Sequence, residues 1–366
     1  MNAGKRRFAT DPRLHLRNMN AGFASRADNS SVDARLLERI CDSYMKAANR
    51  ESFAPASYQP TEWWEQHRKI SLKPVIQALR SRDTEALNAM YQHFYRDPCS
   101  VGLIADQGIA RKCFEDAGDF YRRVYLVDAL YRLDYWKAWA GEAFTLSDLS
   151  GPPVGDPFGV MNEDVLIWAG ADYQHYCAHR VCGLLNSRRD PGLGSKTAVV
   201  EIGGGFGGMA YYLLRDRPGV TYIDFDVPES IALTSYFLMR AFPELTVLLY
   251  GEKDLTKEAI AQADIVLMPV FELAAMPAKY AQVTLSSHAM SDLTHVALDN
   301  YLKHIISVTT DYFLCIGNGS SAKTISELVK RRHPKLKMAE TRSSGWHDHK
   351  VQNINEVECL YEVYGG

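Results

Sequence analysis

The chain has no run of the roughly 18 to 20 uninterrupted apolar residues that a membrane helix needs, which argues against a membrane span. Its basic start is not followed by the apolar core of a signal peptide, so we expect a cytoplasmic protein. The seven cysteines are scattered and form no C-x-x-C pair, which argues against a disulfide framework or a zinc ribbon. No long block of one charge accompanies the net charge of -3, so a nucleic-acid partner is not expected.

What is present is a globular composition over 366 residues, with 46% hydrophobic and 23% charged residues, a length typical of about two domains. Residues 1–30 are polar, basic and aperiodic, and we expect a flexible N-terminal arm there. Helical spacing of apolar residues then predicts a mostly helical N-terminal domain over residues 31–190. A catalytic α/β domain is predicted over residues 191–366.

Short apolar segments alternate with helical stretches in this last region, which is typical of a doubly wound α/β sheet. The final two predicted strands have no long helix between them, so we expect this C-terminal pair to form an antiparallel hairpin at one edge of the sheet. The predicted strands are Thr197–Ile202, Thr221–Phe225, Ile265–Met268, Val283–Ser286, Tyr312–Ile316, Lys337–Glu340 and Val357–Tyr364.

The segment VEIGGGFGG at Val200–Gly208 joins an apolar strand to a helix through glycines, which let the backbone approach a nucleotide-like cofactor. Gly203, Gly205 and Gly208 fit the dinucleotide fingerprint, whereas Glu201 with Gly203, Gly205 and Gly207 fits the pattern of S-adenosylmethionine (SAM) enzymes. An acidic side chain at Glu201 would repel a pyrophosphate and favour the ammonium and sulfonium of SAM. SAM is therefore the expected cofactor, with NAD as the alternative.

The next predicted strand ends at Asp224 and Asp226, about 20 residues after the glycines, where a carboxylate can accept both hydrogens of a ribose diol. We assign that role to Asp226, with Asp224 as the alternate. Capping of the following helix is the competing interpretation for both residues.

The glycine segment, the DVPE sequence at Asp226–Glu229 and the SSHAMSD sequence at Ser286–Asp292 together resemble the bacterial putative sugar O-methyltransferases. Further matching segments are YRDPCSVGL at Tyr95–Leu103, GDPFG at Gly155–Gly159 and DYQHY at Asp172–Tyr176. The resemblance implies a Rossmann-like, SAM-dependent methyltransferase acting on a carbohydrate acceptor. Within its motifs, Val227 and Ser286 are expected at the cofactor. Ser286, Ala289 and Asp292 replace the Asn, Ser and Glu that are more common in that family.

Methyl transfer to a sugar hydroxyl needs an aligned acceptor oxygen and a group that removes its proton. His288 follows a predicted strand at the ligand-binding edge of such a sheet and is our first candidate for the base. Asp292, one helical turn further, is the second candidate for the base, or orients His288, or binds the acceptor. Capping of the next helix by Asp292 is the competing interpretation.

The resemblance places a helix around Asp172–Tyr176 over the cofactor. We therefore assign Tyr173 and Arg180 to the cofactor, where Arg180 can pair with the methionine carboxylate, and Tyr176 and His175 to the acceptor. A position on the helix surface or in the core is the competing interpretation for each of them. Trp346 and His347 are predicted to close over the acceptor. A divalent cation such as Mg²⁺ held by His347, Asp348 and His349 is an alternative, but we predict no metal site.

The residues favour SAM-dependent methyl transfer, and the resemblance implies that the acceptor is a hexose hydroxyl in a bacterial polysaccharide, oligosaccharide or glycolipid. Three alternatives stay open: methylation of a hydroxyl or amine of a natural product, NAD-dependent oxidation, and a non-catalytic SAM-binding module. The sequence does not fix the oligomeric state, and a homo-oligomer is compatible with it.

Overall fold

The computed structural model of the chain describes residues 7–27, 34–104, 112–114, 118–187, 196–343 and 356–364. The elements that precede the glycine segment are η1 (Pro12–Leu14), α2 (Leu16–Phe23), α3 (Ala34–Glu51), η2 (Ala56–Tyr58), α4 (Glu62–Lys69), α5 (Lys73–Ser81), α6 (Thr84–Tyr91), η3 (Pro98–Ser100), α8 (Gly118–Ala140), η4 (Leu146–Leu149), β1 (Gly159–Asn162), β2 (Val165–Trp168) and α9 (Ala171–Asn186). Among the described helices, none combines the length and the apolar character needed to cross a lipid bilayer.

The remaining elements alternate between strands and helices, as the sequence predicts. They are β3 (Ala198–Ile202), α10 (Gly208–Asp216), β4 (Thr221–Asp226), α11 (Pro228–Ala241), β5 (Val247–Leu249), α12 (Lys257–Ala261), β6 (Ile265–Pro269), η5 (Val270–Ala274), β7 (Ala281–Ser287), α13 (His295–Val308), β8 (Thr309–Asn318), α14 (Gly319–Arg332), β9 (Leu336–Ser343) and β10 (Glu356–Val363). The three-residue strand β5 and the β1–β2 hairpin were not predicted.

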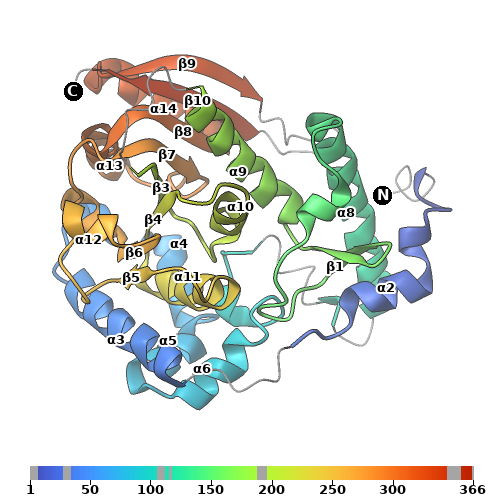
Figure 1. Cartoon of the computed structure of the whole chain (residues 1–366). Helices are drawn as coiled ribbons and strands as arrows, with labels where there is room; N and C mark the ends of the chain where they lie inside the picture. Colours follow the sequence, from blue (N-terminus) through green and yellow to red (C-terminus); the bar gives the residue numbers. More distant parts are fainter. Residues whose placement is uncertain are drawn as a thin grey trace.

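One sheet contains eight strands in the order β5-β6-β4-β3-β7-β8-β10-β9 (Figure 1). Neighbouring strands from β5 to β8 are parallel, whereas β10 is antiparallel to both β8 and β9. From β3 the chain forms β4, then the outermost strand β5, and then β6 between β4 and β5, before it crosses back to place β7 on the other side of β3. The predicted doubly wound α/β fold with an antiparallel C-terminal edge hairpin is therefore confirmed.

Alternate residues of the central strands face two separate hydrophobic cores, because side chains of a strand point to opposite faces of the sheet. Val199 of β3 and Tyr222 of β4 belong to the core under α9, α10 and α11. Val200 and Ile223, one position further along each strand, belong to the core under α12, α13 and α14. Because both faces are covered, these strands have nearly continuous apolar sequences.

The N-terminal helices join the first of these cores, with α3 packed along α11. Arg68 of α4 connects them through charge: its guanidinium donates to Glu51 of α3 at 2.8 and 2.9 Å and to Glu229 of α11 at 2.5 and 2.9 Å. Trp64 of α4 also donates its indole N–H to Glu229. Both carboxylates are largely removed from water, and they share the single positive charge of Arg68. The division of the chain near residue 190 stays a prediction.

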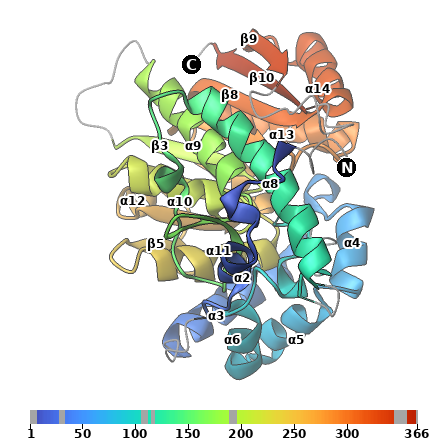
Figure 2. The same ribbon diagram turned by 90° about the vertical axis from the view of Figure 1, so that its right-hand side faces the viewer.

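The expectation of a flexible arm over residues 1–30 is wrong for its described part, residues 7–27. Leu14, Met19 and Phe23 are buried, and the ring of Phe23 stacks on Phe158 with centroids 5.4 Å apart. Helix α2 lies beside α8 (Figure 2). The sequence of this segment looks polar because its few apolar side chains are widely spaced. Most of those side chains nevertheless lie on the face that packs against the rest of the protein.

Close packing also fixes this N-terminal segment to the β1–β2 hairpin. A Cβ on Gly22 of α2 would lie 2.3 Å from the carbonyl oxygen of Gly159, so only glycine permits this approach. The buried carboxylate of Asp156 accepts the backbone N–H of Arg26 at 2.5 Å and the hydroxyl of Ser25 at 3.1 Å. The segment is therefore an integral layer of the structure.

Replacement of Arg68 by alanine should lower the free energy of unfolding by about 3 to 5 kcal/mol, because two buried carboxylates would lose their cation. Urea denaturation at neutral pH measures the change. Arg331→Ala on α14, at an exposed position, is the matched control and should change stability by no more than about 0.5 kcal/mol. Equal effects of the two substitutions would contradict the importance of the buried network.

Candidate functional site at the switch point of the sheet

The turn after β3 has a backbone that only glycine adopts readily. Gly203, Gly205 and Gly207 have φ values of 79°, 64° and 92°, in the left-handed region. Gly207 is the N-cap residue of α10, so the turn ends where free N–H groups of a helix begin. The predicted strand, glycine turn and helix are therefore all present.

The turn lies where the strand order reverses, between β3 and β7, which is the position at which doubly wound sheets bind ligands. The residues after β7 pack directly on it: a Cβ on Gly203 would lie only 2.2 Å from the Cβ of Ala289. Ser286 strengthens this junction, because its buried hydroxyl donates to the carbonyl oxygen of Ile202 at 3.2 Å. The structure thus brings the glycine turn and the SSHAMSD segment together.

Three acidic side chains lie on one face of the sheet beneath the glycine turn. Glu201 is the register partner of Asp224 on the neighbouring strand, and Asp226 lies two residues further along β4. Glu201 is buried and accepts the hydroxyl of Tyr222 at 2.6 Å. Burial raises the pKa of Glu201 to about 7 and that of Asp226 to about 7, and it raises the pKa of Asp224 well above its usual range.

Asp226 is tied to the loops on either side of it. Its Oδ2 accepts the backbone N–H of Gly205 at 3.0 Å, and its Oδ1 accepts that of Val227 at 2.7 Å. The N-cap residue of α11 is Val227, so Asp226 does not occupy the capping position that the alternative interpretation gave it. Each carboxylate oxygen keeps a second lone pair for a ligand hydroxyl. Val227 is itself partly buried at this junction.

His288 follows β7 in a backbone conformation that is uncommon outside glycine, with φ of 62°. Its Nε2 lies 2.8 Å from Oε2 of Glu356, the first residue of β10. Half of its side-chain surface, 49%, remains exposed, whereas Glu356 is buried. His288 is adjacent to Ala289, so this imidazole and the glycine turn belong to one site.

Asp292 does not take the place that the sequence indicated. It is exposed in the turn that follows His288, and α13 begins three residues later. The cap of α13 is Thr294, whose hydroxyl accepts the backbone N–H of Ala297 at 3.2 Å. The carboxylate that contacts His288 is Glu356, which sequence reasoning missed because it lies 68 residues away. A catalytic role of Asp292 stays a prediction.

Helix α9 contributes Tyr173 to this site. The Tyr173 hydroxyl and the Ser287 hydroxyl lie 2.6 Å apart, and the rings of Tyr173 and His288 have centroids 6.2 Å apart. Gln174 packs against Gly208 at the start of α10, where a Cβ on the glycine would lie 2.9 Å from the Gln174 side chain. The N-terminal end of α9 therefore lies against the glycine turn, and its place over a cofactor stays a prediction.

The other three α9 residues point elsewhere, contrary to their predicted roles. Tyr176 is fully buried and donates its hydroxyl to Glu358 of β10, so it is not placed to contact an acceptor. Arg180 donates to Glu358 at 3.1 Å and lies 3.6 Å from Glu340 of β9, so its charge is already matched at the sheet edge. His175 is also fully buried. Tyr176 and Arg180 lie on the same face of α9 as Tyr173, but one and two turns further along the helix, where they reach β10 instead of the end of β7. His175 lies on a different face of the helix. Trp346 and His347 lie outside the described residues.

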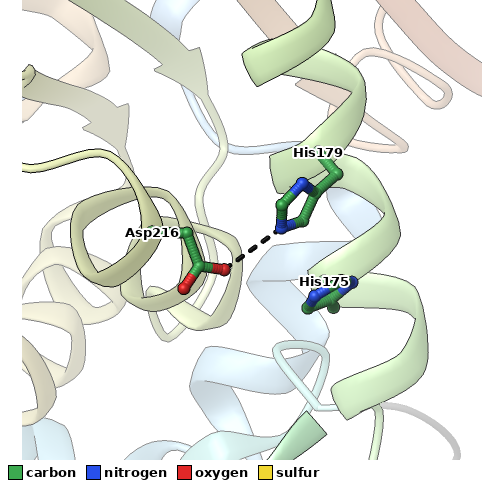
Figure 3. Close-up of side chains that lie close together, drawn as sticks. All are labelled: His175, His179 and Asp216. Atoms are coloured by element: carbon green, nitrogen blue, oxygen red, sulfur yellow. Dashed lines mark hydrogen bonds and ion pairs between the residues drawn. The ribbon is translucent and has the colours of Figure 1, made fainter. Parts of the chain in front are cut away.

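In the described part of the chain, one group of three side chains has the geometry to hold a metal ion: His175, His179 and Asp216 (Figure 3). The carboxylate of Asp216 already accepts from Arg215 at 2.5 and 2.9 Å and contacts His179 at 3.1 Å. The indole N–H of Trp136 donates to Nδ1 of His175 at 3.2 Å, so Nε2 must carry the ring proton.

A metal-ligating histidine normally donates its second nitrogen to an acceptor, whereas the second nitrogen of His175 faces a donor. Burial lowers the pKa of His175 to about 3, so the ring stays neutral among its aromatic neighbours. These contacts fit a hydrogen-bonded aromatic cluster better than a metal site. The absence of a metal stays a prediction.

The strand order and the glycine turn define a doubly wound α/β protein with a ligand site at the switch point. No protein-family model matches the sequence, and no curated protein does. Solved structures with a similar fold include the pyocyanin biosynthetic protein PhzM (13% identity, TM-score 0.36, covering 53% of this chain and 56% of PhzM). Another is the Synechocystis magnesium protoporphyrin IX methyltransferase with bound SAM (12% identity, TM-score 0.36, covering 72% of this chain and 99% of that one). A third is a SAM-dependent methyltransferase from Aquifex aeolicus (10% identity, TM-score 0.35, covering 52% of this chain and 92% of that one). At these scores the fold assignment rests on the strand order.

Replacement of Gly203 by alanine should destabilise the protein by about 1 to 3 kcal/mol, because the new Cβ meets Ala289 and the residue must keep a positive φ. Gly183→Ala, at an exposed position of α9 with open space around it, is the control. It should stabilise the protein by about 0.5 to 1 kcal/mol through helix propensity. Urea denaturation of both variants measures the two changes in the free energy of unfolding, which should have opposite signs. Changes of the same sign would contradict the packing of Gly203 against Ala289.

Proposed function

We propose that the protein transfers a methyl group from SAM to a hydroxyl group, and that its acceptor is a sugar. The observation that carries the proposal is the convergence of three parts at one switch point. They are a glycine turn with left-handed backbone angles, a carboxylate at Asp226 that can bind a ribose, and the imidazole of His288, whose chain neighbour Ala289 packs on that turn. The sugar acceptor rests on the sequence resemblance alone.

The charge of the site fits SAM better than a dinucleotide. Glu201 and Asp224 are buried below the turn and Asp226 is partly buried, and none of the ion pairs within the described residues includes any of the three. A pyrophosphate would add like charge, whereas SAM brings an ammonium and a sulfonium. The residues that would hold SAM are Glu201, Gly203, Gly205, Gly207, Asp226, Val227, Ser286 and Tyr173. Of the predicted set, Arg180 is the one that the geometry does not favour.

When bound, SAM supplies an electrophilic methyl group, and the chain must supply alignment and proton removal. Glu356 accepts a hydrogen bond from Nε2 of His288, which leaves the lone pair on Nδ1 to accept the hydroxyl proton of the acceptor. The buried carboxylate also stabilises the imidazolium that forms. Tyr173 and Ser287 lie beside His288 and position the acceptor oxygen.

Residues 31–190 form the acceptor-binding part in this proposal, and residues 191–366 the catalytic part. Helix α4 supports the assignment, because Trp64 and Arg68 tie it to Glu229 directly after Val227 and Pro228. Loop residue Leu103 also reaches the glycine turn, where a Cβ on Gly205 would lie 3.5 Å from its carbonyl oxygen. We also assign Trp346 and His347 to the acceptor site, and these two assignments stay predictions.

Calorimetric titration with SAM, S-adenosylhomocysteine and NADH tests the cofactor. The two adenosyl ligands should bind with or without EDTA and added Mg²⁺, and NADH should not. Asp226→Ala should weaken SAM binding by at least about tenfold through loss of the ribose hydrogen bonds. Asp254→Ala, an exposed aspartate, is the control and should bind like wild type. Binding of NADH alone would mean that the turn holds a pyrophosphate.

Methyl transfer to a panel of mono- and oligosaccharides tests the chemistry. His288→Ala should keep SAM affinity and lower the rate by about 10²-fold or more, because the base is lost. Glu356→Gln should lower the rate less and shift its pH profile, while His295→Ala at the exposed start of α13 should match wild type. Turnover unchanged in His288→Ala would remove the assigned base. Turnover only with a non-sugar hydroxyl would correct the acceptor.

A further inference from the structure

Asp224 is the deepest of the three acids below the glycine turn and has no exposed surface. Its Oδ1 accepts the backbone N–H of Gly204 at 3.0 Å. Its Oδ2 is buried and has no hydrogen-bond partner among the described residues. A bare carboxylate with an unpaired, buried oxygen would be costly in free energy, so the position calls for an explanation.

The groups around Asp224 increase that cost. Glu201 faces it across the β3–β4 register, and Asp226 lies on the same face of β4. Tyr222, the other titratable neighbour on this face, donates its hydroxyl to Glu201 and so does not neutralise Asp224. Interactions with Asp226 and Glu201 both disfavour a negative charge on Asp224, and burial disfavours it most.

Asp224 also determines how closely the glycine turn approaches the sheet. A Cβ on Gly204 would lie 2.8 Å from Oδ1 of Asp224 and 2.5 Å from the Tyr222 hydroxyl oxygen. The peptide of Gly204 is thus seated directly on these two side chains. Gly203 and Gly205, the neighbours of Gly204, carry the left-handed conformations of the turn.

We propose that Asp224 is a positioning residue that holds the glycine turn as a neutral carboxylic acid, while Asp226 alone acts as the charged ligand of the ribose. The role of Asp226 as the ligand of a ribose rests on the proposed function, whereas the protonation state of Asp224 does not. A neutral acid satisfies the Gly204 N–H through its carbonyl oxygen and places no second negative charge beside Asp226.

Replacement by asparagine should therefore have different effects on ligand binding at the two aspartates. Asparagine has the shape of a neutral carboxylic acid, so Asp224→Asn should bind S-adenosylhomocysteine within about threefold of wild type. Asp224→Ala, which loses the contact to Gly204, should bind at least about tenfold more weakly. Asp226→Asn should also lose at least about tenfold, because there the charge is used. Titration calorimetry at about pH 8, where Asp226 is mostly ionised, gives the three affinities.

A second measurement does not depend on the ligand. The urea midpoint of Asp224→Asn should equal or exceed that of wild type, and its advantage should grow from about pH 6 to about pH 8, where Asp224 of the unfolded chain is ionised and the folded chain must keep it protonated. Asp224→Ala should have a lower midpoint. A large loss of midpoint in Asp224→Asn would overturn the proposal, as would binding as weak as that of Asp226→Asn. Normal midpoints with no binding by wild type would instead overturn the proposed cofactor.

Discussion

The close packing of the turn after β3 is the constraint on which the site depends. On one side Gly203 meets Ala289, and on the other Gly204 rests on Tyr222 and Asp224, so the backbone has no room for side chains at either point. The same contacts fix the position of His288, because it precedes Ala289 in the chain. Three positive φ angles occur in this short turn, and glycine adopts them without the strain that a side chain would bring.

The molecule accommodates acidic side chains away from water in two different ways. Glu51 and Glu229 share the guanidinium of Arg68, and this arrangement joins the N-terminal helices to α11. Glu201, Asp224 and Asp226 are held instead by hydroxyl and backbone donors, and burial raises their pKa values. The first arrangement is complete in itself and serves stability. The second leaves an acidic centre that a cationic ligand would stabilise, which is the electrostatic basis of the proposed function.

Helix α9 shows how one helix serves two purposes. Tyr173 faces the end of β7, while Tyr176 and Arg180 face β10 and connect the sheet edge to the helix through Glu358. The C-terminal hairpin is in turn part of the site, since its first residue on β10, Glu356, orients His288. The antiparallel edge therefore contributes to the proposed chemistry as well as closing the sheet.

Local patterns were enough to predict the doubly wound sheet, the edge hairpin and the glycine turn, because continuous apolar strands and glycine-rich turns leave a signature within a few residues. They did not reveal β5, which is three residues long, or the packed N-terminal segment, whose apolar side chains are sparse. Asp226 and His288 could be proposed as site residues because one ends a recognisable strand and the other directly follows one. The pairing of His288 with Glu356, the burial of Tyr176 and His175, and the difference between Asp224 and Asp226 were decided only by the tertiary structure. Each depends on which distant strand or helix lies alongside, and the free energy of a buried charge is set by those neighbours.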